Sequence, residues 1–214
     1  MGCDKNENHK HISNDFFVLT GYTHCAMAKT YPSISDDLKQ WIVKQPMYFI
    51  ASAPLQADGH VNLSPRGLDS LRVISDNEVV ILDITGSGNE TAAHLHENGR
   101  MTIMFCSFEK EPKILRLYGQ GHVIQTEHPN WSTYLSLFDA SLPAIRQIFH
   151  LSVKRIQTSC GFGVPLMSFV SQRDTLIRVS EKQGPEGIRK FQLERNTHSI
   201  DGLPTPGIGP ASDT

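Results

Sequence analysis

One short polar segment of the sequence contains residue types that bind anions. GSGNET, residues 86–91, follows the apolar run VVILDIT and precedes a stretch with helical periodicity. A helix N-terminus carries free backbone amides and roughly half a positive charge, so it favours a bound anion. The two glycines, Gly86 and Gly88, let the backbone approach a ligand closely. Neutral hydrogen-bond donors come from three neighbours: Ser87, Asn89 and Thr91. This junction therefore predicts an anion-binding site, with phosphate as the expected anion.

Two arginines elsewhere favour the same kind of ligand. Arg66 lies in the rigid turn SPRG, and Arg116 stands alone in the apolar run ILRLYG. A buried guanidinium without a partner is costly, so an arginine in an apolar strand favours an anionic partner. A purely structural interpretation stays open: the junction caps a helix, Arg66 is solvated, and Arg116 faces outward. The residue types alone do not decide between the two.

The junction also nearly matches the dinucleotide-binding motif G-x-G-x-x-G. Thr91 stands where the third glycine is required, although Glu109 supplies the acidic residue that the motif expects downstream. The rest of the chain lacks the alternation of strands and helices that such a fold needs. We therefore do not predict a dinucleotide-binding fold.

The cysteines and histidines form no metal-binding motif. The four cysteines are scattered, with no C-x-x-C pair: Cys3, Cys25, Cys106 and Cys160. This spacing favours reduced thiols in a cytoplasmic protein. His94 and His96 lie two residues apart on a predicted helix, so they point to different faces and do not chelate one ion. Cys160, in TSCGFGVP, has two interpretations: a reactive thiol beside a cofactor, or a buried structural cysteine.

Length and composition limit the classes of protein. A chain of 214 residues, 39% of them hydrophobic, can form one domain with a sizeable core. The formal net charge of −2 gives no bulk attraction to nucleic acid or to an anionic membrane. The apolar stretches, such as residues 47–55, are too short to span a bilayer. We expect neither a nucleic-acid nor a membrane partner.

Hydrophobic periodicity predicts about six strands and several helices. The strands are expected at residues 47–55, 61–67, 77–85, 100–108, 113–124 and 150–159. The helices are expected within residues 31–45 and at residues 91–98, 131–138, 143–149 and 174–196, the last interrupted near Gly184 and Pro185.

Local signals refine these elements. Ser33 or Ser35 can cap the first helix, and Asp58–Gly59 predicts a hairpin turn. Pro65 is expected to break its strand, and His96 is expected to face inward on its helix.

The links between strands are short, and only one helix sits between successive strands. This indicates mainly antiparallel pairing, because parallel strands need long crossovers. The prediction is a mainly β fold, a closed or half-closed β-barrel with peripheral helices. Residues 1–30 are predicted to be a polar, disordered extension, in which Gly2 and Cys3 only partly match an acylation signal. Residues 31–198 form the barrel with a C-terminal helix, and residues 199–214 form a Gly/Pro-rich tail.

The order of three segments resembles a known family. ASAPLQADGHVNLSPRG, VVILDITGSGNETAAHLHENGRMTIMF and KILRLYGQGHVI are similar to the pyridoxamine 5'-phosphate oxidase-like family of FMN-binding split barrels. The resemblance runs from about Tyr31 to Val123. It implies a Greek-key antiparallel barrel that forms a homodimer, with two FMN molecules in clefts at the subunit interface.

The resemblance also implies a set of cofactor contacts. Beside the flavin it places Ser64, Pro65, Arg66 and Gly67. Around the phosphate it places Thr85, Ser87, Gly88, Asn89, Glu90 and Thr91, and beneath the ring system it places Arg116. Two features depart from the family. Glu90-Thr91 replaces the Arg-Lys pair of the authentic oxidases, and Arg195 and His198 are one residue too far apart for their Arg-x-His substrate clamp.

The predicted function is therefore an FMN-binding oxidoreductase that uses NAD(P)H or a small-molecule substrate, rather than an oxidase of vitamin B6. One alternative is a non-catalytic carrier or sensor of flavin, deazaflavin or haem on the same barrel. The other is a globular protein without a ligand site, whose glycines only make turns.

Overall fold

The structure, a computed structural model, describes residues 28–209; the predicted N-terminal extension, with Gly2, Cys3 and Cys25, lies almost wholly outside this range. Its strands are β1 (Lys29–Tyr31), β2 (Tyr48–Ser52), β3 (Asn62–Arg66), β4 (Leu71–Ser75), β5 (Glu78–Ile84), β6 (Arg100–Cys106), β7 (Ile114–Ile124) and β8 (Ile145–Ser159). Its helices are α1 (Asp36–Val43), α2 (Glu90–Glu97), α3 (Trp131–Leu135) and α4 (Thr175–Arg195).

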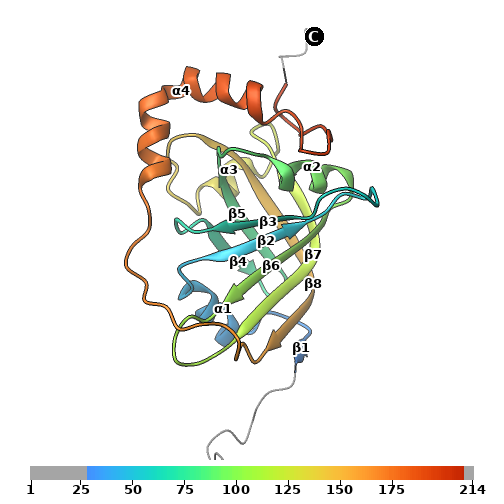
Figure 1. The fold of residues 1–214 in the computed structure, drawn as a ribbon, viewed down its shortest axis with the longest axis vertical. Helices are drawn as coiled ribbons and strands as arrows, with labels where there is room; N and C mark the ends of the chain where they lie inside the picture. Colours follow the sequence, from blue (N-terminus) through green and yellow to red (C-terminus); the bar gives the residue numbers. More distant parts are fainter. Residues whose placement is uncertain (1–27, 210–214) are drawn as a thin grey trace, which may run out of the picture.

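All strand pairs are antiparallel, and the strands form one curved sheet (Figure 1). The order is β3-β2-β6-β7-β8-β5-β4, with β1 added beside β8. The two end strands, β3 and β4, are joined by a short turn but do not pair with each other. The predicted mainly β barrel with peripheral helices is confirmed, in its half-closed form.

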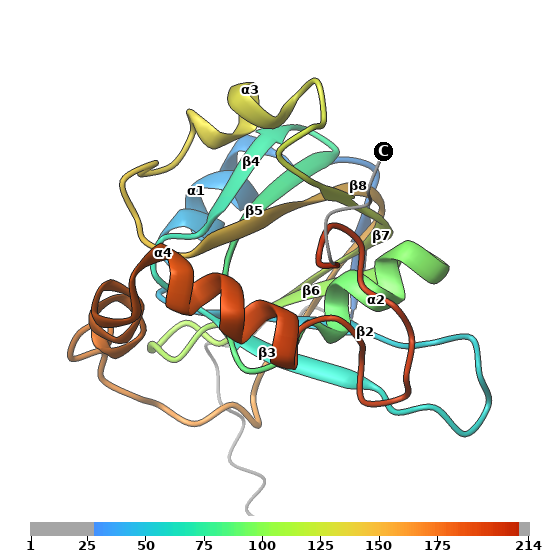
Figure 2. The same cartoon turned by 90° about the horizontal axis from the view of Figure 1, so that it is seen from above.

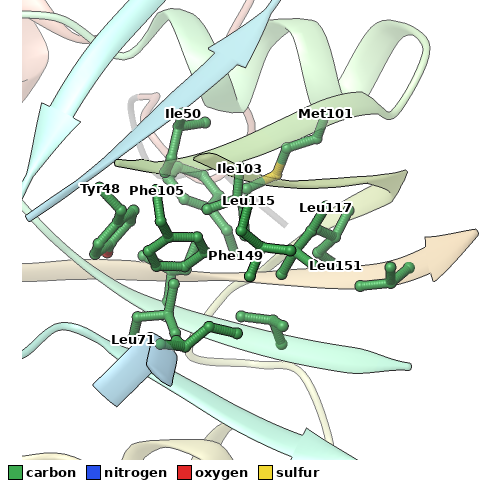
Figure 3. Close-up of a cluster of buried hydrophobic side chains, with 14 of the residues drawn as sticks. Tyr48, Ile50, Leu71, Met101, Ile103, Phe105, Leu115, Leu117, Phe149 and Leu151 are labelled. Atoms are coloured by element: carbon green, nitrogen blue, oxygen red, sulfur yellow. The ribbon is translucent and has the colours of Figure 1, made fainter. Parts of the chain in front are cut away.

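The core fills the inside of the curved sheet (Figure 3). Buried and less buried residues alternate along β2 and β6, so one face of each strand packs inward. β5 is buried along nearly its whole length because both of its faces are covered. One face lies against the core, and the other contributes Val80 and Leu82 to a second cluster with Ile148 and Phe138.

Several local predictions are confirmed. Ser35 caps α1, accepting a hydrogen bond from the backbone of Leu38 at 3.4 Å. α2 and α4 form close to where periodicity places them, and α4 is interrupted at Gly184, whose φ is 65°.

Other local predictions were wrong. Residues 145–149 begin β8 rather than a helix, and β1 and β4 were not predicted. Pro65 does not break β3, because β3 is an edge strand and needs no N–H at that position. On α2 it is His94 that faces inward, whereas His96 is exposed.

The part of the chain after β8, residues 160–209, crosses the open side of the sheet. From the end of β8 it runs alongside the barrel, and Met167 and Gln172 hydrogen-bond to backbone groups of the barrel loops. α4 then lies over the same end of the barrel as α2, and the segment after α4 lies between these two helices (Figure 2). Within residues 28–209, no helix is both long and apolar enough to cross a membrane.

Candidate functional site

A cavity of about 730 Å³ lies where three parts of the chain meet: the end of β3 with its turn, the junction before α2, and the end of α4. Nine of the eleven predicted cofactor contacts line this site cavity: Ser64, Pro65, Arg66, Gly67, Ser87, Gly88, Asn89, Glu90 and Thr91. The fold therefore brings together the turn and the junction, which are 18 or more residues apart in sequence.

The other two predicted contacts lie outside the cavity lining. The hydroxyl of Thr85 donates to the carbonyl of Ala144 at 3.0 Å and accepts a hydrogen bond from Gln192 at 2.8 Å. Arg116 lies on β7 and donates to the hydroxyl of Ser159 at 3.2 Å. Their assignment as cofactor contacts stays a prediction.

A β-bulge brings an arginine to the cavity that the sequence analysis missed. Asp83 of β5 pairs with Gln147, whereas the next residue of β5 pairs with Ile145. Arg146 is therefore the extra residue of the bulge, a feature that often re-aims a side chain at a site. Its side chain is 3% exposed and lines the cavity.

Three charged side chains form a buried cluster behind the cavity. Asp83, which is fully buried, accepts hydrogen bonds from Arg66 and from Arg146, the latter at 2.8 Å. Burial alone would raise the pKa of the Asp83 carboxyl, but the two guanidiniums outweigh it and hold this pKa below its usual range. Two positive charges therefore face one carboxylate, which leaves one uncompensated positive charge at the cavity wall.

Amide side chains tie this charge cluster to the junction. Gln147 donates to Asp83 at 2.8 Å and to the side-chain oxygen of Asn89 at 2.7 Å. Arg146 donates to the carbonyl of Gly88 at 3.1 Å and to Asn196, just after α4, at 2.7 Å. The Asn89 side chain is thus engaged within the protein and does not cap α2. The junction is fixed from two sides.

The backbone of the junction is rich in unused donors. Within residues 28–209, the backbone N–H groups from Gly86 to Ala92 meet no hydrogen-bond acceptor. The first turn of a helix leaves such donors for a ligand or water. These donors and the charge cluster lie at the same cavity.

The segment after α4 forms the outer wall. Arg195 and His198 both line the cavity, although their spacing departs from the family clamp. The Glu90 carboxylate accepts the backbone N–H of Ile200 at 3.0 Å, and Asp201 pairs with His60 at 2.7 Å. Glu90 therefore holds the wall in place, and Arg195 on that wall balances its charge.

Two other features considered in the sequence are a reactive thiol at Cys160 and a metal site. Cys160 is half-buried rather than buried, and it does not line the cavity, so the structure supports neither the buried cysteine nor the thiol beside a cofactor. In the described part of the chain, no three His, Cys, Asp or Glu side chains come together in a way that would hold a metal ion.

Arg146 and Asp83, which the sequence analysis missed, could have been identified from their positions in apolar runs. Arg146 lies in the apolar run IRQIF, as Arg116 lies in ILRLY, and Asp83 interrupts VVILDI. A charged side chain in an apolar strand favours a partner of opposite charge, and this argument, used above for Arg116, predicts such a partner for Arg146 and for Asp83. Asn62, which also lines the cavity, carried no such signal.

Comparison with known proteins gave consistent matches. The family model described as "Pyridoxamine 5'-phosphate oxidase" matches residues 34–160. A curated relative, the "Pyridoxamine 5'-phosphate oxidase family protein ustO" of Aspergillus flavus, is 39% identical over 190 residues, which is 81% of this chain and 76% of the relative.

Similar solved structures are more distant. HupZ of Group A Streptococcus is 22% identical with a TM-score of 0.48, covering 57% of this chain and 91% of that one. An FMN-binding protein of Syntrophomonas wolfei is 15% identical with a TM-score of 0.41, covering 62% and 84%.

Proposed function

The chain belongs to the pyridoxamine 5'-phosphate oxidase family, and on that premise we propose that its site cavity binds FMN and that the protein is a flavin-dependent oxidoreductase. The observation that carries the proposal is the uncompensated positive charge of Arg66, Arg146 and Asp83 beside the free amides of the junction. A desolvated positive charge is stabilised by a bound anion, and free backbone N–H groups at the start of a helix bind phosphate.

The residues present fit FMN. Arg66, Arg146 and the junction amides would hold the phosphate. The apolar side chains of Leu68, Leu82, Ile84 and Leu176, which line the same cavity, would contact the flavin and exclude water. Bound FMN supplies hydride or electron transfer, so no catalytic acid or base of the chain is required for it.

The chain's own residues set the conditions for that chemistry. The charge cluster is fixed by Gln147 and Asn196, so its positive charge is pre-oriented before a ligand arrives. Such preorganisation reduces the cost of ordering side chains on binding. Arg195 on the outer wall balances the charge of Glu90, and its guanidinium is a hydrogen-bond donor for an anionic substrate or an electron donor such as NAD(P)H.

We also propose that the protein acts as a homodimer. Support comes from the segment between β8 and α4, where apolar side chains are 61–91% exposed on the single chain: Leu166, Met167, Phe169 and Val170. Exposed apolar patches of this kind mark interaction surfaces. Size-exclusion chromatography with light scattering tests this: a mass of one chain at micromolar concentration would contradict it.

A non-catalytic carrier or sensor is the second candidate. It is favoured by Glu90, which places a carboxylate at the junction where the authentic oxidases have a basic residue. Two measurements separate the candidates. Purified protein is titrated with FMN and with riboflavin and followed by flavin fluorescence; bound flavin is then mixed with NADPH without oxygen. Binding with rapid bleaching supports the oxidoreductase, binding without bleaching supports the carrier, and absence of FMN binding contradicts FMN as the cofactor in either role.

A further inference from the structure

Asn62, on the edge strand β3, lies at the centre of a cluster of hydroxyl groups. Its side-chain Nδ2 donates to Thr91 Oγ1 at 3.1 Å and to Ser52 Oγ at 3.3 Å. Its Oδ1 accepts a hydrogen bond from Ser64 Oγ at 3.0 Å. Asn62, Ser64 and Thr91 all line the site cavity. One amide therefore contacts three hydroxyls, two of which face the cavity.

The Asn62 amide determines whether each neighbouring hydroxyl donates or accepts a hydrogen bond. An amide nitrogen only donates and an amide oxygen only accepts, whereas a hydroxyl can do either. Thr91 receives a hydrogen bond from Asn62, so its own hydrogen is available; within residues 28–209 it meets no acceptor. Ser64 gives its hydrogen to Asn62, so it offers only lone pairs to the cavity.

The far end of the cluster is fixed by a buried histidine. Ser52 Oγ accepts from Asn62 and lies 2.9 Å from Nδ1 of His94, whose side chain is 1% exposed. Burial lowers the pKa of His94, which favours the neutral imidazole. Ser52 can then give its hydrogen to His94 Nδ1, and His94 Nε2 is left without a partner in the described chain. The two hydrogens of the Asn62 amide therefore go to two hydroxyls: Ser52, which passes its own hydrogen on to His94, and Thr91, whose hydrogen remains available at the cavity.

We infer that Asn62 is a positioning residue: it makes the Thr91 hydroxyl a hydrogen-bond donor to the phosphate of the bound flavin nucleotide, and the Ser64 hydroxyl an acceptor. This inference rests on the proposed function, because it assigns a direction to hydrogen bonds in that same cavity. Thr91 is 3% exposed and belongs to the first turn of α2, next to the free junction amides. A donor there adds to the positive end of the site.

The test uses variants that remove one property each. Thr91→Val keeps the shape but removes the hydroxyl. Asn62→Asp replaces the donor nitrogen by an acceptor oxygen, which draws the Thr91 hydrogen away from the cavity. Ser64→Ala removes the acceptor, and Asn130→Asp at the exposed start of α3 makes the same change of charge away from the cavity.

Dissociation constants for FMN and riboflavin are measured on the full chain, with thermal unfolding without flavin as a check of folding. Hydrogen bonds to charged groups are worth enough to change affinity roughly tenfold to a hundredfold. We expect losses of that size for FMN with Thr91→Val and Asn62→Asp, and losses below about threefold for riboflavin, which lacks the phosphate. Asn130→Asp is expected to leave both constants unchanged.

The double variant gives the sharpest readout. Because Asn62→Asp already turns the Thr91 hydrogen away, adding Thr91→Val is expected to cost little more. Multiplied losses, equal losses for FMN and riboflavin, or a loss of FMN affinity in Ser64→Ala but not in Thr91→Val would overturn the inference while leaving the proposed function intact. Wild-type protein that binds no FMN overturns the proposed function, and the inference with it.

Discussion

Asp83 and Arg146 lie on neighbouring strands, β5 and β8, and meet at 2.8 Å with their side chains 0% and 3% exposed. Arg66 reaches the same carboxylate from the edge strand β3. The pair therefore links the interior of the sheet to the wall of the site cavity. A change at either residue is expected to affect both stability and ligand binding, and these two effects can be measured separately.

Replacing Asp83 by Asn is expected to lower the free energy of unfolding by about 3–5 kcal/mol. Removing one partner of a buried ion pair leaves uncompensated charge, and here two guanidiniums lose their carboxylate. Urea unfolding measures the loss. Asp69→Asn is the control, because Asp69 pairs with Arg72 at the surface and exposed pairs are worth at most about 1 kcal/mol. Equal losses in both variants would contradict the role of burial.

Replacing Arg146 by Gln is expected to weaken FMN binding roughly tenfold or more and to change riboflavin binding much less. The substitution removes the excess positive charge and leaves Asp83 paired with Arg66 alone. Titrations on folded protein measure both constants. Arg155→Gln removes an exposed arginine from the same strand and is expected to leave both unchanged. A similar loss for both flavins in Arg146→Gln would show that the phosphate does not contact this charge.

Local signals were sufficient to place the start of α2 at the junction but not to predict the partner strand β8. Glycines and small polar residues before a helix predict an anion seat without knowledge of the fold. The start of β8 was predicted as a helix because its apolar residues are buried on both faces and show no strand alternation. Arg146 was missed with it. Its contact with Asp83 also depends on a bulge in the β5–β8 pairing, which no local pattern specifies.

Tertiary packing likewise decides which face of a short helix is buried. α2 has only eight residues, and its apolar stripe is too short to fix the rotation of the helix. Packing against β2 turns His94 inward toward Ser52, where the sequence analysis had placed His96. The hydroxyl cluster around Asn62 joins β2, β3 and α2, so it could be found only in the folded structure.

Ala144→Gly is expected to stabilise the protein by about 0.5–1 kcal/mol. Ala144 has a φ of 60°, in the left-handed region that costs a residue with a Cβ about 1–2 kcal/mol, and part of this gain is offset by the greater freedom of glycine in the unfolded chain. Ala140→Gly is the control: Ala140 is exposed and has no positive φ, so the same change should destabilise. Urea unfolding of both variants tests the opposite signs, and a loss of stability in Ala144→Gly would contradict the expected relief of strain.

The buried His94 is expected to make stability depend on pH. Burial lowers its pKa in the folded state, whereas in the unfolded chain it titrates near 6.5. As the pH falls below about 6.5, the unfolded state binds a proton that the folded state does not. The free energy of unfolding therefore falls toward lower pH, by at most about 1.4 kcal/mol per pH unit from this residue. Urea unfolding is measured at pH 7.5 and at pH 5.5, on the two sides of about pH 6.5. It is compared between wild type, His94→Gln and the exposed control His122→Gln. Only His94→Gln should show a smaller loss on acidification than wild type, and equal losses in all three proteins would show that His94 takes up its proton without unfolding.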